Sequence, residues 1–77
     1  MPICYCLIST ELGHAESVME TLKNIDAVEE AYMVYGTYDI VAKIKTENMD
    51  KLKDNIIHAR FLNQVQSTQT LVVMSET

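Results

Sequence analysis

The 77-residue chain has few cysteines and no long apolar run, and each shortage excludes a class of protein. Its only cysteines, Cys4 and Cys6, form neither the disulfide framework of a small secreted domain nor a paired Cys-x-x-Cys metal site. We interpret both as small buried hydrophobic residues. The longest early apolar run, at 3–8, is too short for a signal peptide or a membrane span, so no membrane association is expected and the predicted compartment is the cytoplasm.

Positive charge and recognisable catalytic motifs are also scarce. Six basic residues stand against 11 acidic ones, for a net charge of −5, and nucleic-acid binding depends largely on basic residues that neutralise phosphates, so direct binding is not expected. The sequence has no glycine-rich phosphate loop, nucleophile elbow or paired-carboxylate motif. His14 and His58 have no cysteine or carboxylate at ligand spacing. We therefore predict no catalytic residues, no metal and no cofactor.

Hydrophobic periodicity predicts the order strand, helix, strand, strand, helix, strand. The predicted strands, rich in β-branched or aromatic residues, are 3–8, 28–35, 38–45 and 65–74. Apolar residues at helical spacing predict helices at 15–25 and 49–59, with Asn48 as a cap for the second. A tight turn is expected at Gly36-Thr37. The order predicts one α+β domain over 1–77, a ferredoxin-like βαββαβ fold whose four-stranded antiparallel sheet has two helices on one face.

Apolar residues occupy both sides of most of these strands, and two helices can cover only one face of the sheet. A large apolar surface left after a soluble chain has folded usually marks an interface. We therefore predict a homodimer that forms sheet to sheet, with further assembly through edge strands. The residues predicted for the dimer interface are Tyr5, Leu7, Tyr32, Val34, Val72 and Met74.

Two motifs resemble one known family. Gly36-Thr37-Tyr38-Asp39 lies between two apolar strands and resembles the Gly-x-Tyr-Asp turn of the Lrp/AsnC effector-binding domain, also called the RAM domain. Thr68 and Thr70 alternate before an apolar run, as in the last strand of that domain, and the strand order agrees, so the resemblance covers essentially the whole chain. The family often has Pro-Gly before its second and last strands. Here those places hold Asp26-Ala27 and Asn63-Gln64, which changes loop rigidity but not sheet register.

The resemblance implies partners as well as a fold. It implies an amino-acid effector bound between dimers near the Gly-x-Tyr-Asp turn, and assembly of dimers into higher oligomers, from tetramer to decamer. The family's regulators carry an N-terminal helix-turn-helix domain, for which this sequence has no room. We therefore expect a stand-alone form of the domain that modulates full-length Lrp/AsnC regulators and does not bind DNA itself.

The residue types of the two motifs suit an amino-acid ligand. Asp39 could accept a hydrogen bond from a ligand ammonium, or it could cap the turn. Tyr35 and Tyr38 offer apolar rings with hydroxyls, and Gly36 permits a positive φ and a close approach. The two threonines could hydrogen-bond the ligand, or they could be ordinary strand formers. The predicted ligand-binding residues are Tyr35, Gly36, Thr37, Tyr38, Asp39, Thr68 and Thr70.

Two other functions stay open at this stage. A small dimeric ferredoxin-like enzyme, such as a monooxygenase, would need an acid–base set, for which Tyr5, Tyr32 and the two histidines are the only candidates. A co-assembly subunit would instead join full-length regulators and modulate them without a ligand.

Overall fold

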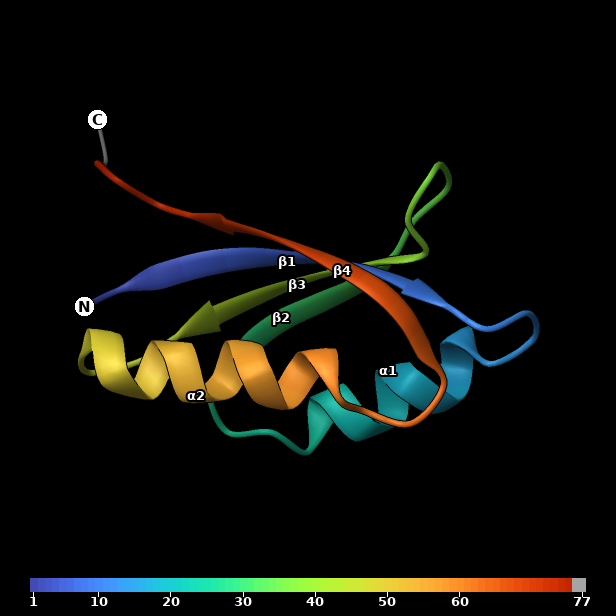
Figure 1. Ribbon diagram of the computed structural model, residues 1–77, viewed down its shortest axis with the longest axis horizontal. Helices are drawn as coiled ribbons and strands as arrows, with labels where there is room; N and C mark the ends of the chain where they lie inside the picture. Colours follow the sequence, from blue (N-terminus) through green and yellow to red (C-terminus); the bar gives the residue numbers. More distant parts are fainter. Residues whose placement is uncertain (76–77) are drawn as a thin grey trace.

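A computed structural model of the protein describes residues 1–75 and confirms the predicted order of elements (Figure 1). The elements are β1 (Ile3–Thr10), α1 (Ala15–Lys23), β2 (Val28–Met33), β3 (Ile40–Lys45), α2 (Met49–Arg60) and β4 (Val65–Val72). All neighbouring strands are antiparallel, in the order β2-β3-β1-β4. Both helices lie under one face of the sheet, which is the ferredoxin-like α+β arrangement.

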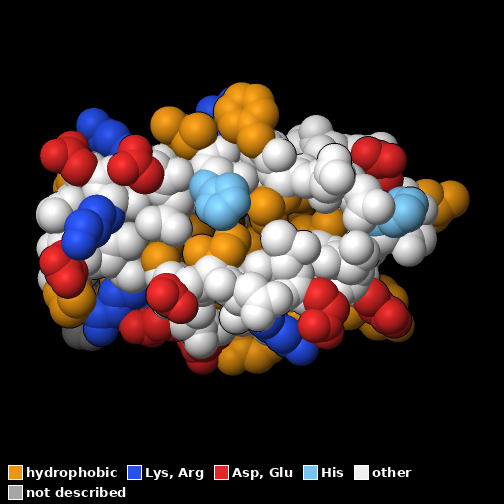
Figure 2. Space-filling view, turned by 90° about the horizontal axis from the view of Figure 1, so that it is seen from below, with side chains coloured by type: hydrophobic (Ala, Val, Ile, Leu, Met, Phe, Trp, Pro, Cys, Tyr) orange, Lys and Arg blue, Asp and Glu red, His pale blue; other side chains and the backbone are white. Residues whose placement is uncertain are grey.

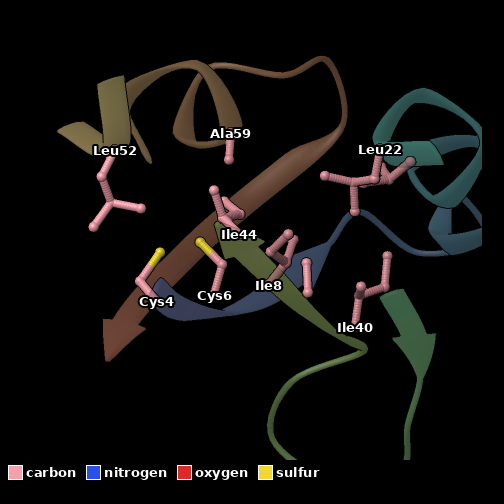
Figure 3. Close-up of a cluster of buried hydrophobic side chains, with 10 residues drawn as sticks. Cys4, Cys6, Ile8, Leu22, Ile40, Ile44, Leu52 and Ala59 are labelled. Atoms are coloured by element: carbon pink, nitrogen blue, oxygen red, sulfur yellow. The ribbon is translucent and has the colours of Figure 1, made fainter. Parts of the chain in front are cut away.

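The hydrophobic core lies between the sheet and the helices. Every second residue of β1 faces the helices, beginning with Cys4 and Cys6, and both thiols are free and fully buried as predicted. Leu52 of α2 lies toward the Cys4 end of this core cluster, and Leu22 of α1 lies toward Ile8 and Ile40 (Figure 3). Burial, with a smaller contribution from Cys6, raises the pKa of Cys4 to about 11. The cysteines therefore behave as core hydrophobic residues.

Polar and charged side chains surround the helix side of the molecule. Viewed from below, acidic and basic groups lie mostly around the rim, and hydrophobic atoms show along the middle and in several places at the rim (Figure 2). In the part of the chain that the structure describes, no helix covers the opposite face of the sheet. We call this second face the open face, and define it by Tyr5, Leu7, Tyr32, Val41 and Leu71.

Local hydrogen bonds fix the start of the second helix. The side-chain oxygen of Asn48 accepts a hydrogen bond from the backbone N–H of Lys51 at 2.9 Å, which confirms the predicted N-cap. His14 occupies the same position before α1, but its side chain makes no capping bond. The start of α2 is therefore better defined than that of α1.

The loop between β2 and β3 is longer than the sequence predicts. Residues 34–39 separate the strands, so the expected tight turn at Gly36-Thr37 is wrong. Gly36 does have a positive φ of 136°. The backbone N–H of Asp39 donates to Ile8 of β1 at 2.8 Å, and its carbonyl accepts from Val34 at 2.9 Å. Asp39 is thus tied to β1 as well as to β2, which widens the connection into a six-residue loop that rises away from the helices (Figure 1).

β4 ends at Val72, two residues before the predicted boundary. Met74 follows the strand, and 93% of its surface is exposed. Among residues 1–75, no helix is long and apolar enough to cross a membrane.

Candidate functional site

Asp39 joins the base of the β2–β3 loop to the end of β1. Its Oδ2 atom accepts one hydrogen bond from the backbone N–H of Thr10 at 2.8 Å and a second from the Thr10 hydroxyl at 3.2 Å. Thr10 is buried and ends β1 just after a shift in strand register. The carboxylate therefore satisfies a backbone donor at the point where the strand irregularity leaves it unpaired. The alternative considered from the sequence was a cap of the residue's own turn, whereas here Asp39 caps the end of β1.

A surface hollow of about 300 Å³ lies beside this carboxylate. Asp39, Thr10 and Met33 of β2 line it, together with residues of the segment that leads into α1 and of its first turn. The remaining lining residues are Glu11, Leu12, Gly13, Ala15 and Glu16. The hollow thus combines three carboxylates with the apolar side chains of Leu12 and Met33. Such a lining favours a small ligand that has a positive group and an apolar part.

The tip of the β2–β3 loop is exposed. Tyr35 is entirely open to solvent, and nothing lies within 4 Å of the place where a Cβ of Gly36 would stand. Thr37 is also exposed, whereas Tyr38 is half-buried and its hydroxyl donates to the side-chain oxygen of Gln69 at 2.9 Å. Tyr38 therefore holds the loop against β4, while the other three residues present a free surface.

Thr68 and Thr70 lie on the other side of the sheet from that surface. Thr68 pairs with Ile8 and Thr70 with Cys6, and directly paired residues share a face, so both threonines face the helices. The Thr70 hydroxyl lies 3.7 Å from the Cys6 sulfur. Within one chain, the structure does not bring the two threonines to the exposed loop tip. A site that uses both motifs would need two copies of the chain.

The open face contains three of the six residues predicted for a dimer interface. Tyr5, Leu7 and Tyr32 lie on it, and Tyr5 pairs with Leu71, which is 49% exposed. Val72 pairs with buried Cys4 and so faces the helix side, although it is near the end of an edge strand. Val34 and Met74 follow the ends of β2 and β4 and are exposed. Leu71 is the open-face residue of β4 that the sequence prediction missed.

Charged groups cluster at one end of the open face. Glu29 lies 3.5 Å from the ammonium of Lys43 and 3.7 Å from that of Lys45. The Tyr32 hydroxyl donates to Glu30 at 2.9 Å, and this bond is the main reason that the pKa of Tyr32 is raised. The pKa of Lys43 is raised mainly by electrostatic interaction with Tyr5. The apolar part of the open face is thus bordered by a cluster of acidic and basic side chains.

The acid–base set required by the enzyme alternative is not assembled in one place. Tyr5 and Tyr32 lie on the open face, whereas His14 and His58 belong to the helix layer below the sheet. In the part of the chain that the structure describes, no cluster of three histidine, cysteine or acidic side chains could hold a metal ion.

Sequence reasoning missed the partners of Asp39. Thr10, Glu11 and Glu16 join it at the hollow although Thr10 is 29 residues away in sequence. The polar ending of the first strand at Thr10 is a signal, because its backbone N–H and its hydroxyl both need an acceptor when the strand end is buried. Glu11 and Glu16 carry no such signal, since only the fold brings them close to the hairpin.

The chain is thus a small ferredoxin-like α+β domain with one uncovered sheet face and a hollow beside Asp39. The chain belongs to the Lrp/AsnC family: the family model described as the Lrp/AsnC ligand binding domain matches residues 3–77.

Known relatives agree with this assignment. The regulatory protein AsnC of Escherichia coli K12 is 33% identical over 73 residues, which is 90% of this chain and 48% of AsnC. The HTH-type transcriptional regulator FL11 of Pyrococcus furiosus is 28% identical over 72 residues, 94% of this chain and 48% of FL11. The chain thus spans about half the length of the curated relatives it matches. The crystal structure of FFRP-DM1 superposes with a TM-score of 0.92 at 33% identity, covering 96% of this chain and all of that one.

Proposed function

We propose that the protein binds a small amino acid at the β2–β3 loop, forms sheet-to-sheet dimers, and modulates transcription regulators of its family from the cytoplasm without binding DNA itself. The observation that carries the proposal is the position of Asp39. Its Oδ2 atom holds Thr10, and its other oxygen is left to meet a ligand ammonium at the neighbouring hollow. The relatives AsnC and FL11 are named as regulators, which supports a regulatory role.

The exposed loop tip supplies the rest of the proposed site. Tyr35, Gly36 and Thr37 are exposed in the single chain, so a second copy can approach their backbone closely. Thr68 and Thr70 would enter this site from another subunit, because in their own chain they lie across the sheet. Ligand binding and assembly would then be coupled, since the ligand contacts more than one chain.

The sheet-to-sheet dimer rests on the open face. Tyr32 and Leu71 are both about half exposed on it, and Tyr5 is more than a third exposed. An exposed aromatic and aliphatic surface of this kind on a small soluble domain is stabilised by burial against a partner. The mixed charges of Glu29, Lys43 and Lys45 at its border would give the pairing its register.

Isothermal titration of the protein with each of the twenty amino acids tests the ligand. Binding of one or a few amino acids, lost in Asp39→Asn and kept in the control Asp54→Asn on α2, supports the proposal. Heat from none of them, together with an unchanged sedimentation profile in their presence, contradicts it.

One observation favours the co-assembly alternative. Asp39 already has a structural task, because it satisfies Thr10, and a purely structural Asp39 requires no ligand. A pull-down with a full-length regulator of the family separates the two functions. Capture that is independent of amino acids indicates a co-assembly subunit, whereas capture that changes with one amino acid indicates a sensor.

A further inference from the structure

A second hollow, of about 290 Å³, lies between the end of α2 and the first half of β4. It is lined by Arg60, Phe61, Gln66, Ser67 and Thr68. This lining has one cationic side chain and no acidic one, whereas the hollow beside Asp39 is lined by three carboxylates and no cation. The two hollows therefore suit ligand groups of opposite charge.

Arg60 is the single arginine of a chain whose net charge is −5. Within residues 1–75, ion pairs are made only by lysines of β3 and α2, so the Arg60 guanidinium has no carboxylate partner there. A guanidinium presents its N–H donors in a planar fork that matches the two oxygens of a carboxylate. The charged side of this hollow is thus ready to receive an anion.

β4 adds hydrogen-bond donors to the hollow, because it is an edge strand of the sheet. The N–H of Val73 donates to the carbonyl of Ile3 at 2.9 Å, and successive residues of an antiparallel strand alternate between facing the partner strand and facing away. The backbone N–H of Thr68 therefore points out of the sheet edge. Its side chain faces the helix layer, so Thr68 can offer both a backbone N–H and a hydroxyl at the hollow.

Phe61 gives the hollow an apolar wall. It follows Arg60 directly as the C-cap of α2, and 80% of its surface is exposed. An aromatic ring that is this open to solvent is stabilised when it packs against the flat or apolar part of a ligand. A guanidinium and a ring in one small hollow favour a ligand that joins an anionic group to an apolar body.

We propose that this hollow binds a small carboxylate that has an apolar or aromatic body and no ammonium group. The Arg60 guanidinium takes the carboxylate, the N–H of Thr68 donates to one of its oxygens, and the apolar body lies against Phe61. An ammonium group is excluded because the lining has no acid to pair with it. The site is distinct from the proposed amino-acid site, whose ligand needs the carboxylate of Asp39.

NMR titration of the isotope-labelled protein with benzoate tests the proposal. We expect saturable shifts in the millimolar range at the amides of Arg60, Phe61 and Thr68, and none with benzamide, which has the same ring but no charge. Arg60→Gln should weaken benzoate binding at least about tenfold, because it removes hydrogen bonds between charged groups. The matched control is Lys53→Gln, which removes one exposed positive charge about two turns earlier on α2 and should change binding by less than about twofold.

Three results would overturn the proposal: no saturable shifts with benzoate, equal binding of benzamide, or equal losses in Arg60→Gln and Lys53→Gln. If Arg60→Gln does not fold, the wild-type shifts decide, and shifts confined to the β2–β3 loop count against the site. Benzoate has no ammonium group, so the result does not depend on whether an amino acid binds at Asp39. A role for Arg60 only in stabilising the end of α2 would give no benzoate binding at all.

Discussion

The carboxylate of Asp39 accepts two hydrogen bonds from Thr10, and so fixes the end of β1 from a position 29 residues further along the chain. One of these donors is a backbone N–H and the other a hydroxyl. The same residue is the acid of the Gly-x-Tyr-Asp turn. The position of Asp39 in the fold therefore gives a structural reason for an acid at the end of the β2–β3 loop, even before any ligand is considered.

Replacing Asp39 with alanine should destabilise the fold. The change leaves the buried Thr10 donors unsatisfied, which costs about 1–3 kcal/mol of unfolding free energy. Urea denaturation measures the loss. Asp54→Ala, at an exposed position of α2, should change stability by no more than about 0.5 kcal/mol. In a double-mutant cycle with Thr10→Val, a coupling energy near zero would show that the hydroxyl bond contributes nothing.

The cap of α2 can be tested on its own. Asn48→Ala removes the acceptor for the Lys51 N–H and should cost about 1 kcal/mol, measured by thermal or urea unfolding. Asn48→Asp should keep most of the stability, because aspartate caps equally well. The control is Asn55→Ala, whose amide only bonds back to the Lys51 carbonyl within the helix. Equal losses in the two alanine variants would contradict a specific capping role.

Because the thiol of Cys4 is buried, we expect the stability of the fold to depend on pH in the alkaline range. Its pKa is about 11 in the folded chain, against an ordinary value of 9.0, because burial disfavours the thiolate. The folded state therefore holds this proton more tightly than the unfolded chain does. Its contribution to stability is complete below pH 9 and is lost as pH rises toward and through 11.

The measurement compares wild type with Cys4→Ala between pH 8 and 11.5. The alanine variant should lose less stability over that range, and the native wild-type protein should react slowly with a thiol reagent at pH 8 until it is unfolded. Identical pH profiles for the two proteins would show that Cys4 ionises as an ordinary thiol.

Adjacent residues of β4 distinguish the two faces of the sheet. Leu71 lies on the open face and Val72 on the helix side. Leu71→Lys should weaken the sheet-to-sheet dimer by more than about tenfold, since it places like charges in a buried contact, and about 1.4 kcal/mol already suffices for that factor. Val72→Lys should leave the sheet-to-sheet contact nearly unchanged. Sedimentation equilibrium gives the dimer dissociation constants of both variants. A larger effect at Val72 than at Leu71 would place the interface on the helix side of the sheet.

Gln64 has a backbone conformation that favours glycine. Its φ is 71°, and it precedes β4 at the place where the family often has Pro-Gly. A left-handed conformation costs a non-glycine residue about 1 kcal/mol. Gln64→Gly should therefore raise the unfolding free energy by up to about 1 kcal/mol, and Asn63→Gly should not. Loss of stability in Gln64→Gly would show that the Gln64 side chain contributes more than this strain costs.

The order and type of the elements follow from local pattern. Alternation in β3 and helical spacing in α2 are properties of neighbouring residues, and Asn48 lies directly before the helix that it caps. The buried cysteines also follow, because they alternate with the other side of β1. Such features need no knowledge of which strands meet.

Features that depend on strand pairing could not be predicted with the same success. Which side of β4 faces the helices is set by its register with β1, so the sequence alone favoured Val72 where the structure has Leu71 on the open face. The length of the β2–β3 loop depends on the bond from Asp39 to Ile8 of β1. The hollow beside Asp39 needs the segment before α1 to fold against the hairpin, and no local signal in Glu11 or Glu16 indicates that contact.

Helices on a single side of the sheet make the chain unequally sensitive to mutation. A substitution under the helices changes one core, inside one molecule. A substitution such as one at Tyr32, on the bare side, would occur in both halves of a symmetric pair at once, so its effect on association is counted twice while the molecule's own folding is little altered. Evolution could therefore retune how these chains assemble through single changes there, with small risk to the fold that carries them.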